Sequence, residues 1–138
     1  MNEFKFYIPR RLPGLNEIIK WSKSPIPWLS KGKGRVYRYT IEKKRIEQQI
    51  IFDIYKQHHP AIKDLPCFEE CTIDFEWIES NRRRDPSNVC AGGRKFILDA
   101  LVKVGILTND NWLVSSHTDA FRVDKSQAGV VVTITEGS

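Results

Sequence analysis

Three consecutive arginines followed by an aspartate are the feature of this sequence whose chemistry is most specific. The run reads Arg82, Arg83, Arg84, Asp85, Pro86, Ser87 and Asn88. Adjacent positive charges repel one another, so an anionic partner such as a phosphate is expected to meet them. A carboxylate beside a phosphate-binding patch is typical of a site where a divalent metal ion bridges protein and phosphate. The first hypothesis is therefore a metal-dependent enzyme that acts on nucleic acid.

The overall charge is compatible with this hypothesis but does not decide it. The 138 residues include 22 basic and 17 acidic side chains, which gives a formal net charge of +5. Many ordinary proteins carry a similar excess, so local clusters are more informative than the total. Besides the triplet, basic residues gather at Arg10, Arg11, Lys31, Lys33, Arg35, Arg38, Lys43, Lys44 and Arg45. A chain of this length fits one domain with its own core.

Neither the ends nor the cysteines of the chain indicate a secreted or membrane protein. The first residues show no basic leader followed by an apolar run, and no apolar stretch approaches the roughly 20 residues of a membrane span. We expect a soluble cytoplasmic protein with no membrane partner. Cys67, Cys71 and Cys90 lack the spacing of common zinc sites, so free thiols are favoured over a zinc site that includes His58 or His59.

The elements that must position the arginine run are predicted from hydrophobic periodicity. Alternation or β-branched residues predict strands at 4–8, 71–78 and 130–134 and a less regular one within 112–123. Helical spacing predicts a short helix near 16–21, a long one over 40–58 capped by Thr40, and one ending at Gly105. We predict a single-domain α+β fold, with a mixed, mostly antiparallel sheet and two main helices packed on one face.

Two basic surfaces are expected outside the arginine run. Residues 22–35 contain prolines, glycines and basic side chains without periodicity, which indicates an exposed basic loop. Trp28 in this loop would be able to stack on an unpaired base. The outer face of the 40–58 helix is predicted to carry Lys43, Lys44, Arg45 and Lys56, which favours a solvated surface over a DNA contact.

The ordered series of motifs resembles the RusA-type Holliday-junction resolvases, especially those of phages of Gram-positive bacteria. The motifs are Leu12-Pro13-Gly14-Leu15-Asn16-Glu17, Arg83-Arg84-Asp85-Pro86-x-Asn88, the run from Lys95 to Gly105, Asn109-Asp110, and Val132-Thr133-Ile134-Thr135-Glu136. The resemblance covers most of the chain except residues 22–35 and 59–68. It is far more specific as a series than through any single motif.

The resemblance implies a homodimeric endodeoxyribonuclease that nicks four-way DNA junctions symmetrically, with Mg²⁺ or Mn²⁺ as cofactor, in DNA recombination and repair. Residues 1–138 would form one RusA-like endonuclease domain. By position, Asp85 and Asp110 are the catalytic, metal-binding acids, and Asn88 is the asparagine of the motif. The assisting lysine is Lys95 when counted back from Asp99, whereas counting forward from Asn88 places Ala91 there.

Two positions depart from the pattern of this family. Ser87 stands where a second metal-binding aspartate is expected, and Asn109 replaces the first acid of an acidic pair. A serine hydroxyl would hold Mg²⁺ through water but brings no charge. Asp99 or Asp119 would substitute if the fold brought either close. A second hypothesis is therefore a branched-DNA-binding protein of the same fold that has lost or weakened cleavage.

In the enzyme hypothesis Mg²⁺ would activate water and stabilise the transition state, while basic and amide side chains hold the DNA. The predicted DNA-binding residues are Arg82, Arg83, Arg84, Asn88, Lys31, Lys33 and Arg35. Simpler interpretations remain open for single residues. Asp85 before Pro86 is a common helix cap, and Lys95 would pair with Asp99 one turn along the helix. A small basic interaction protein unrelated to junctions is the third hypothesis.

Overall fold

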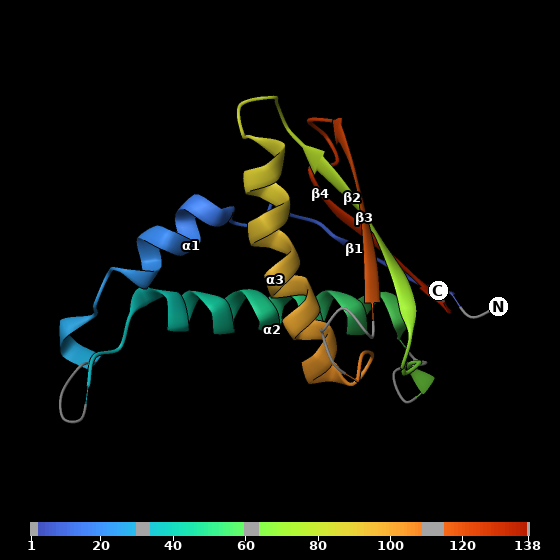
Figure 1. Ribbon diagram of the computed structural model, residues 1–138, viewed down its shortest axis with the longest axis horizontal. Coiled ribbons are helices and arrows are strands. Elements are labelled where there is room, and N and C mark those ends of the chain that lie inside the picture. Colours follow the sequence, from blue (N-terminus) through green and yellow to red (C-terminus); the bar gives the residue numbers. More distant parts are fainter. Residues whose placement is uncertain (1–2, 30–33, 60–63, 109–114, 138) are drawn as a thin grey trace.

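A four-stranded mixed sheet is the centre of the fold (Figure 1). A computed structural model of the chain describes residues 3–29, 34–59, 64–108 and 115–137. The strand order is β1-β4-β2-β3, and β4 (Gly129–Glu136) pairs antiparallel with both β1 (Glu3–Ile8) and β2 (Cys71–Glu79). The edge strand β3 (Ser115–Val123) runs parallel to β2. All four predicted strands are therefore present in the described residues.

The helices lie on one face of this sheet (Figure 1). They are α1 (Leu15–Ser22), α2 (Arg38–His58) and α3 (Pro86–Val104), with a short 3-10 helix η1 (Pro27–Leu29) between the first two. The α+β class and the two main helices on one face are confirmed. Helix α2 begins two residues earlier than predicted, and its N-cap is Tyr37 rather than Thr40. None of the described helices combines the length and the apolar character needed to cross a membrane.

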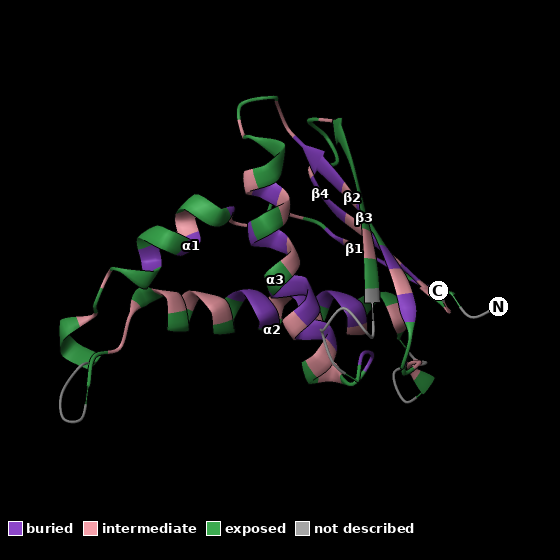
Figure 2. Cartoon of the chain, viewed as in Figure 1, coloured by how far each residue is buried: buried purple, intermediate pink, exposed green. Residues whose placement is uncertain are grey.

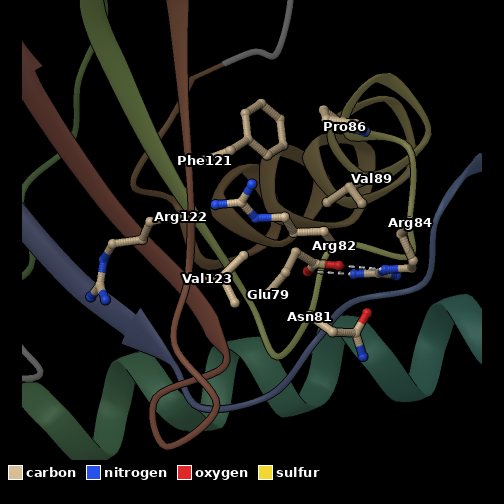
Figure 3. Close-up of a pocket in the computed structure, with 9 residues that line it drawn as sticks. All are labelled: Glu79, Asn81, Arg82, Arg84, Pro86, Val89, Phe121, Arg122 and Val123. Carbon is tan, nitrogen blue, oxygen red and sulfur yellow. Dashed lines mark hydrogen bonds and ion pairs between the residues drawn. The ribbon is translucent and has the colours of Figure 1, made fainter.

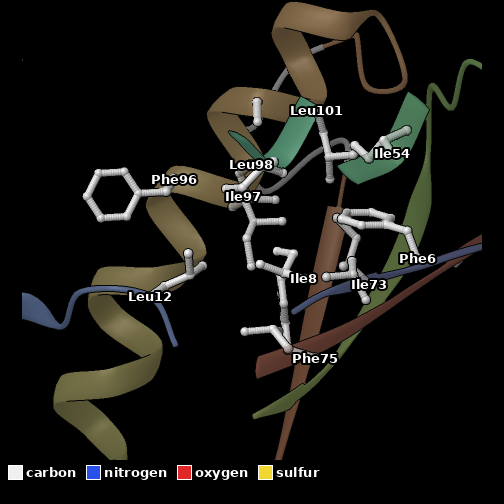
Figure 4. Close-up of a cluster of buried hydrophobic side chains, with 14 of the residues drawn as sticks. Phe6, Ile8, Leu12, Ile54, Ile73, Phe75, Phe96, Ile97, Leu98 and Leu101 are labelled. Atoms are coloured by element: carbon white, nitrogen blue, oxygen red, sulfur yellow. The ribbon is translucent and has the colours of Figure 1, made fainter. Parts of the chain in front are cut away.

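The residues coloured as buried in Figure 2 lie on the strands and along the helices, and the buried apolar ones form one core cluster. The alternation predicted for β2 holds, because Ile73, Phe75 and Trp77 are buried and Asp74 is exposed. Ile97 and Leu101 point from α3 towards the sheet in Figure 4, and both are fully buried. Since parallel strands need a crossover connection, α3 also carries the chain from β2 to β3. This connection puts the start of α3 beside the ends of both strands.

Two adjacent glycines let α3 approach its neighbours closely. A Cβ atom on Gly93 would lie 2.5 Å from Cζ3 of Trp77, and one on Gly92 would lie 2.4 Å from the carbonyl carbon of Gly14. Glycine is unfavourable inside a helix, so close packing is the physical reason for the pair. Gly105 ends α3 with a φ of 85°, as its place after the periodic run predicts.

A buried acid joins α2 to α3. Glu47 is only 1 % exposed, and its carboxylate accepts hydrogen bonds from Lys43 at 2.5 Å and from Lys103. Lys43 also pairs with Asp99 at 2.9 Å. The prediction that Lys43 lies on a solvated outer face is therefore wrong, because its ammonium group faces α3. The suggested pair between Lys95 and Asp99 is also wrong, because Asp99 pairs with Lys43 instead.

Candidate functional site at the start of helix α3

Asp85 is the N-cap of α3, directly after the loop that follows β2. Its Oδ1 atom accepts hydrogen bonds from the backbone N–H of Ser87 at 2.8 Å and from the Ser87 hydroxyl at 2.6 Å. Pro86 occupies the first helical position, where no amide hydrogen is needed. The simpler interpretation of this sequence as a helix cap is thus confirmed. The cap also fixes where the carboxylate lies.

The Asp85 carboxylate is exposed and charged. The hydroxyl and backbone hydrogen bonds from Ser87 hold the pKa of Asp85 below its ordinary value. A carboxylate has about four lone-pair positions, so two hydrogen bonds on one oxygen leave capacity for a cation. Asp85 is therefore accessible and anionic at neutral pH.

The same hydrogen-bond pattern occurs a second time in the chain. Asp124 Oδ1 accepts from the Ser126 N–H at 3.0 Å and from the Ser126 hydroxyl at 2.8 Å, between β3 and β4. Bonds from Ser126 likewise lower the pKa of Asp124. The two sites differ in their surroundings, because Asp124 has an ion pair with Arg122 at 3.2 Å. The cap geometry alone is therefore not distinctive of a metal site.

The arginine triplet divides into one structural and two exposed residues. The Nε and Nη2 atoms of Arg84 donate to the two carboxylate oxygens of Glu79 at 2.7 and 2.8 Å (Figure 3). Its Nη1 atom donates to the Leu12 carbonyl at 2.7 Å. The side chains of Arg84 and Glu79 are 14 % and 11 % exposed. The anion that meets Arg84 is thus an acid of the same chain.

Arg82 and Arg83 are exposed, and no described acid lies within ion-pair distance of either. The Arg83 backbone N–H donates to Asn81 Oδ1 at 2.9 Å, which shapes the turn that presents both side chains. Two positive charges therefore remain available beside Asp85. A phosphate contact stays a prediction for these two residues.

Asn88 connects two of the sequence motifs. Its Oδ1 atom accepts the backbone N–H of Asn16 at 2.8 Å, so α3 supplies a cap for the start of α1. A Cβ atom on Gly14 would lie 2.4 Å from Asn88 Nδ2, which explains the glycine at this position. The DNA-binding role of Asn88 remains a prediction, whereas its bond to α1 is part of the fold.

Replacing Asn88 is expected to weaken the attachment of α1. Asn88→Ala removes the acceptor for the Asn16 N–H, and losing a cap costs about 1 kcal/mol of unfolding free energy. Asn88→Asp keeps an acceptor and is expected to lose less. Urea unfolding followed by circular dichroism measures both variants. Equal stability of Asn88→Ala and wild type would contradict the capping role.

Three residues considered for the site from the sequence do not lie beside Asp85, namely Lys95, Ala91 and Arg35. Lys95 is exposed on α3, ten residues beyond Asp85, which corresponds to about 15 Å along the helix axis. Ala91, the alternative to Lys95, is about 9 Å along the same axis. Arg35 and the exposed Trp28 belong to the region around η1, which lies apart from the start of α3 (Figure 1).

Several predictions fall outside the described residues, namely those for Lys31, Lys33, Asn109 and Asp110. Thr108, the last described residue before this gap, follows the C-terminal end of α3. The 19 residues of α3 separate that end from Asp85 by about 28 Å. Since Asp110 is not among them, the described residues do not test a cation shared by Asp85 and Asp110, which stays a prediction. They also contain no group of three His, Cys, Asp or Glu side chains that would hold a metal.

Asp119, which the sequence suggested as a substitute metal ligand, is occupied by hydrogen bonds within the fold. Its Oδ1 atom accepts the indole N–H of Trp77 at 2.7 Å, and its Oδ2 atom accepts from Arg94 at 3.0 Å. On the same strand, the pKa of His117 is lowered mainly by burial and to a lesser extent by the positive charge of Arg94. Asp119 therefore serves to bind β3 to β2 and α3.

A cavity of about 290 Å³ lies between the start of α3 and the ends of β2 and β3 (Figure 3). Its lining residues are Glu79, Asn81, Arg82, Arg84, Pro86, Val89, Phe121, Arg122 and Val123. Sequence reasoning missed Glu79 and Phe121. The spacing of His117, Asp119, Phe121 and Val123 by two residues is the signal that would have placed them on one face of a strand.

No family model matches the sequence, and no curated protein matches it either.

Proposed function

We propose that the protein is a RusA-type endodeoxyribonuclease that resolves Holliday junctions by symmetric, Mg²⁺-dependent nicking. It acts as a homodimer in the cytoplasm, in DNA recombination and repair. The observation that supports this proposal best is the position of Asp85. Its exposed, ionised carboxylate lies at the N-terminus of a long helix. Shortly before it in the chain come Arg82 and Arg83, which have no acidic partner among the described residues.

The charges around Asp85 fit a site for phosphate and a cation together. Arg82 and Arg83 would bind backbone phosphates, and the N-terminus of α3 carries a partial positive charge that favours an anion. Asp85 alone would repel that anion. A divalent cation that lies between the carboxylate and the phosphate would remove this repulsion, because it is attracted to both.

The donor chemistry at this position fits Mg²⁺. This ion prefers oxygen ligands and usually takes only one or two protein carboxylates. Asp85 would hold it, with the Ser87 hydroxyl as a neutral ligand, and the second acid that the resemblance implies, Asp110, lies outside the described residues. When bound, Mg²⁺ supplies water activation and charge stabilisation. At about 15 Å from Asp85, Lys95 would bind a phosphate further along the DNA.

Cleavage of a synthetic four-way junction tests the proposal directly. We expect paired nicks on opposing strands with Mg²⁺ or Mn²⁺, none with EDTA, and none on a linear duplex of the same sequence. A protein that retards the junction on a gel but never cuts it with either metal would refute the enzyme. Equal binding to linear and branched DNA, or binding to neither, would favour the small basic interaction protein.

A second function, junction binding without cleavage, is favoured by the lack of charge at Ser87. This neutral residue replaces an expected acid, and its hydroxyl donates to Asp85 rather than adding charge to the site. A non-cutting protein would still bind phosphates through Arg82 and Arg83. Its binding to junctions would need no divalent metal.

Ser87→Asp is expected to raise the metal affinity and the cleavage rate several-fold. The new carboxylate would lie in the first turn of α3, where negative charge is favourable. It would also raise the pKa of Asp85, because a hydrogen-bond donor is replaced by a like charge. Nicking rates across a Mg²⁺ titration measure the effect, with Ser126→Asp in the matching motif as the control. No change in either quantity would mean that position 87 does not face the metal.

A further inference from the structure

The cavity beside Asp85 has an aromatic wall that continues a stack of rings in the sheet. The rings of Phe75 and Trp77 lie 5.4 Å apart at 17°, and those of Trp77 and Phe121 lie 6.5 Å apart at 21°. Trp77 is buried, whereas Phe121, the end of the stack, is 40 % exposed on the edge strand. A further flat group placed on Phe121 would extend the stack.

The remaining walls are held in place by interactions within the fold. The Trp77 indole donates to Asp119, which fixes the ring behind Phe121. The bidentate pair of Arg84 with Glu79 holds another wall, and Pro86 and Val89 line the cavity from the first turns of α3. The cavity is thus largely preformed, as sites for small planar groups usually are.

One cation at the cavity has no acidic partner among the described residues. The Arg82 side chain extends between Phe121 and Val123 in Figure 3. By contrast, Arg122 points away from the cavity in this view and pairs with Glu76 at 3.1 Å and with Asp124 at 3.2 Å. Arg82 is therefore the charge available to an occupant of the cavity.

These features suit a flat, mostly apolar group attached to an anion. A volume of about 290 Å³ is close to the lower end of small-molecule sites, roughly 300 Å³. Nucleobases stack on exposed aromatic rings, and a guanidinium binds the adjoining phosphate. Since Pro86 lines the cavity and follows Asp85 directly, a nucleotide there would bring its phosphodiester close to the carboxylate.

We propose that this cavity holds one unstacked nucleobase from the branch point of the DNA, with the base on Phe121 and its phosphate at Arg82. The inference rests on the proposed function, since a branch point supplies the base. Moving a base out of a duplex costs unstacking and unpairing energy, and the cost is smallest where stacking is already interrupted. The cavity would thereby select branched over linear DNA.

A cycle that combines protein and DNA changes tests the assignment. Binding is measured with Ca²⁺ in place of Mg²⁺, on junctions with a normal or an abasic nucleotide at each branch-point position in turn. At one position, wild type is expected to lose roughly 10-fold in affinity when the base is removed. Phe121→Leu is expected to lose the same factor on the normal junction and nothing further on the abasic one. Phe121→Trp keeps a ring and should behave like wild type.

Matched variants separate this effect from unfolding. Phe52, 64 % exposed on α2 and outside the cavity, provides Phe52→Leu as the control, with no loss expected on either DNA. If thermal melting finds Phe121→Leu unfolded, Phe121→Met, which also removes the ring but keeps more of the side-chain volume, replaces it in the same cycle, with coupled losses again expected.

The outcomes distinguish the two proposals. Two results would overturn the cavity assignment and leave the junction function standing, provided that wild type binds junctions tightly and selectively. In one, the affinity losses from Phe121→Leu and from base removal simply multiply when the two changes are combined. In the other, base removal causes no loss of affinity at any position. No preference of wild type for junctions over linear duplex would overturn the proposed function, and the branch-point base with it.

Discussion

Asp85→Asn is expected to reduce junction cleavage by roughly 100-fold or more, the effect typical of removing one group that stabilises charge in a reaction. The fold should be preserved, because asparagine keeps the Oδ1 acceptor for the Ser87 N–H and hydroxyl and is as good an N-cap as aspartate. Junction affinity should stay equal or increase, since a negative charge near the phosphates is removed. Nicking rates and gel-shift affinities on one junction measure both.

Asp124→Asn is the matched control for this variant. Asp124 accepts the same two hydrogen bonds from Ser126, and its pKa is lowered by the same kind of interaction. A role as a helix or turn cap predicts equal behaviour of the two variants, whereas a metal-binding role predicts loss of cleavage only for Asp85→Asn. Unchanged nicking by Asp85→Asn, or equal losses in both, would contradict the metal-binding assignment.

The sequence predicts the elements of this fold well because their patterns are local. Alternation over 71–78 and helical spacing up to Gly105 depend on residues within one element, and both hold in the structure. Lys43 shows where such reasoning ends. Helical periodicity put this lysine on the polar face of α2, with Glu47 one turn further along the same helix, but its second partner Asp99 is known only once α3 lies against α2.

The candidate site was predictable to a similar degree. The cap formed by Asp85, Pro86 and Ser87 spans three residues, so its geometry follows from local rules. The bond from Asn16 to Asn88 joins residues 72 positions apart, and the stacking of Phe121 on Trp77 requires the crossover that brings β3 beside β2. Neither contact follows from spacing. The same crossover places Arg82 and Arg84 beside Phe121 and Val123, where they line one cavity.

Glu79→Ala is expected to have the largest effect on stability. The carboxylate binds both Nε and Nη2 of Arg84, and the two side chains are 11 % and 14 % exposed. Breaking such a pair from one side leaves an uncompensated charge and costs about 3–5 kcal/mol. This is a large part of the roughly 5–15 kcal/mol that stabilises an ordinary domain. Urea unfolding curves of variant and wild type measure the difference.

Glu76→Ala is the control on the same strand. Glu76 pairs with Arg122, but its side chain is 43 % exposed, and exposed pairs contribute only about 0–1 kcal/mol. A similar, small loss in both variants would mean that the Arg84–Glu79 pair is not buried as the structure has it.

The physical cause of the Glu79 effect can be isolated by removing both charges. In Glu79→Leu/Arg84→Met no unpaired charge remains, so most of the loss seen in Glu79→Ala should be recovered. A residual cost of about 1 kcal/mol is expected, because the Leu12 carbonyl loses the hydrogen bond from Arg84. A double variant as unstable as Glu79→Ala would show that packing rather than charge pairing holds the loop of Arg82 and Arg83 in place. If stability returns while junction binding stays normal, Arg84 acts only within the fold, and the phosphate contacts belong to its two exposed neighbours.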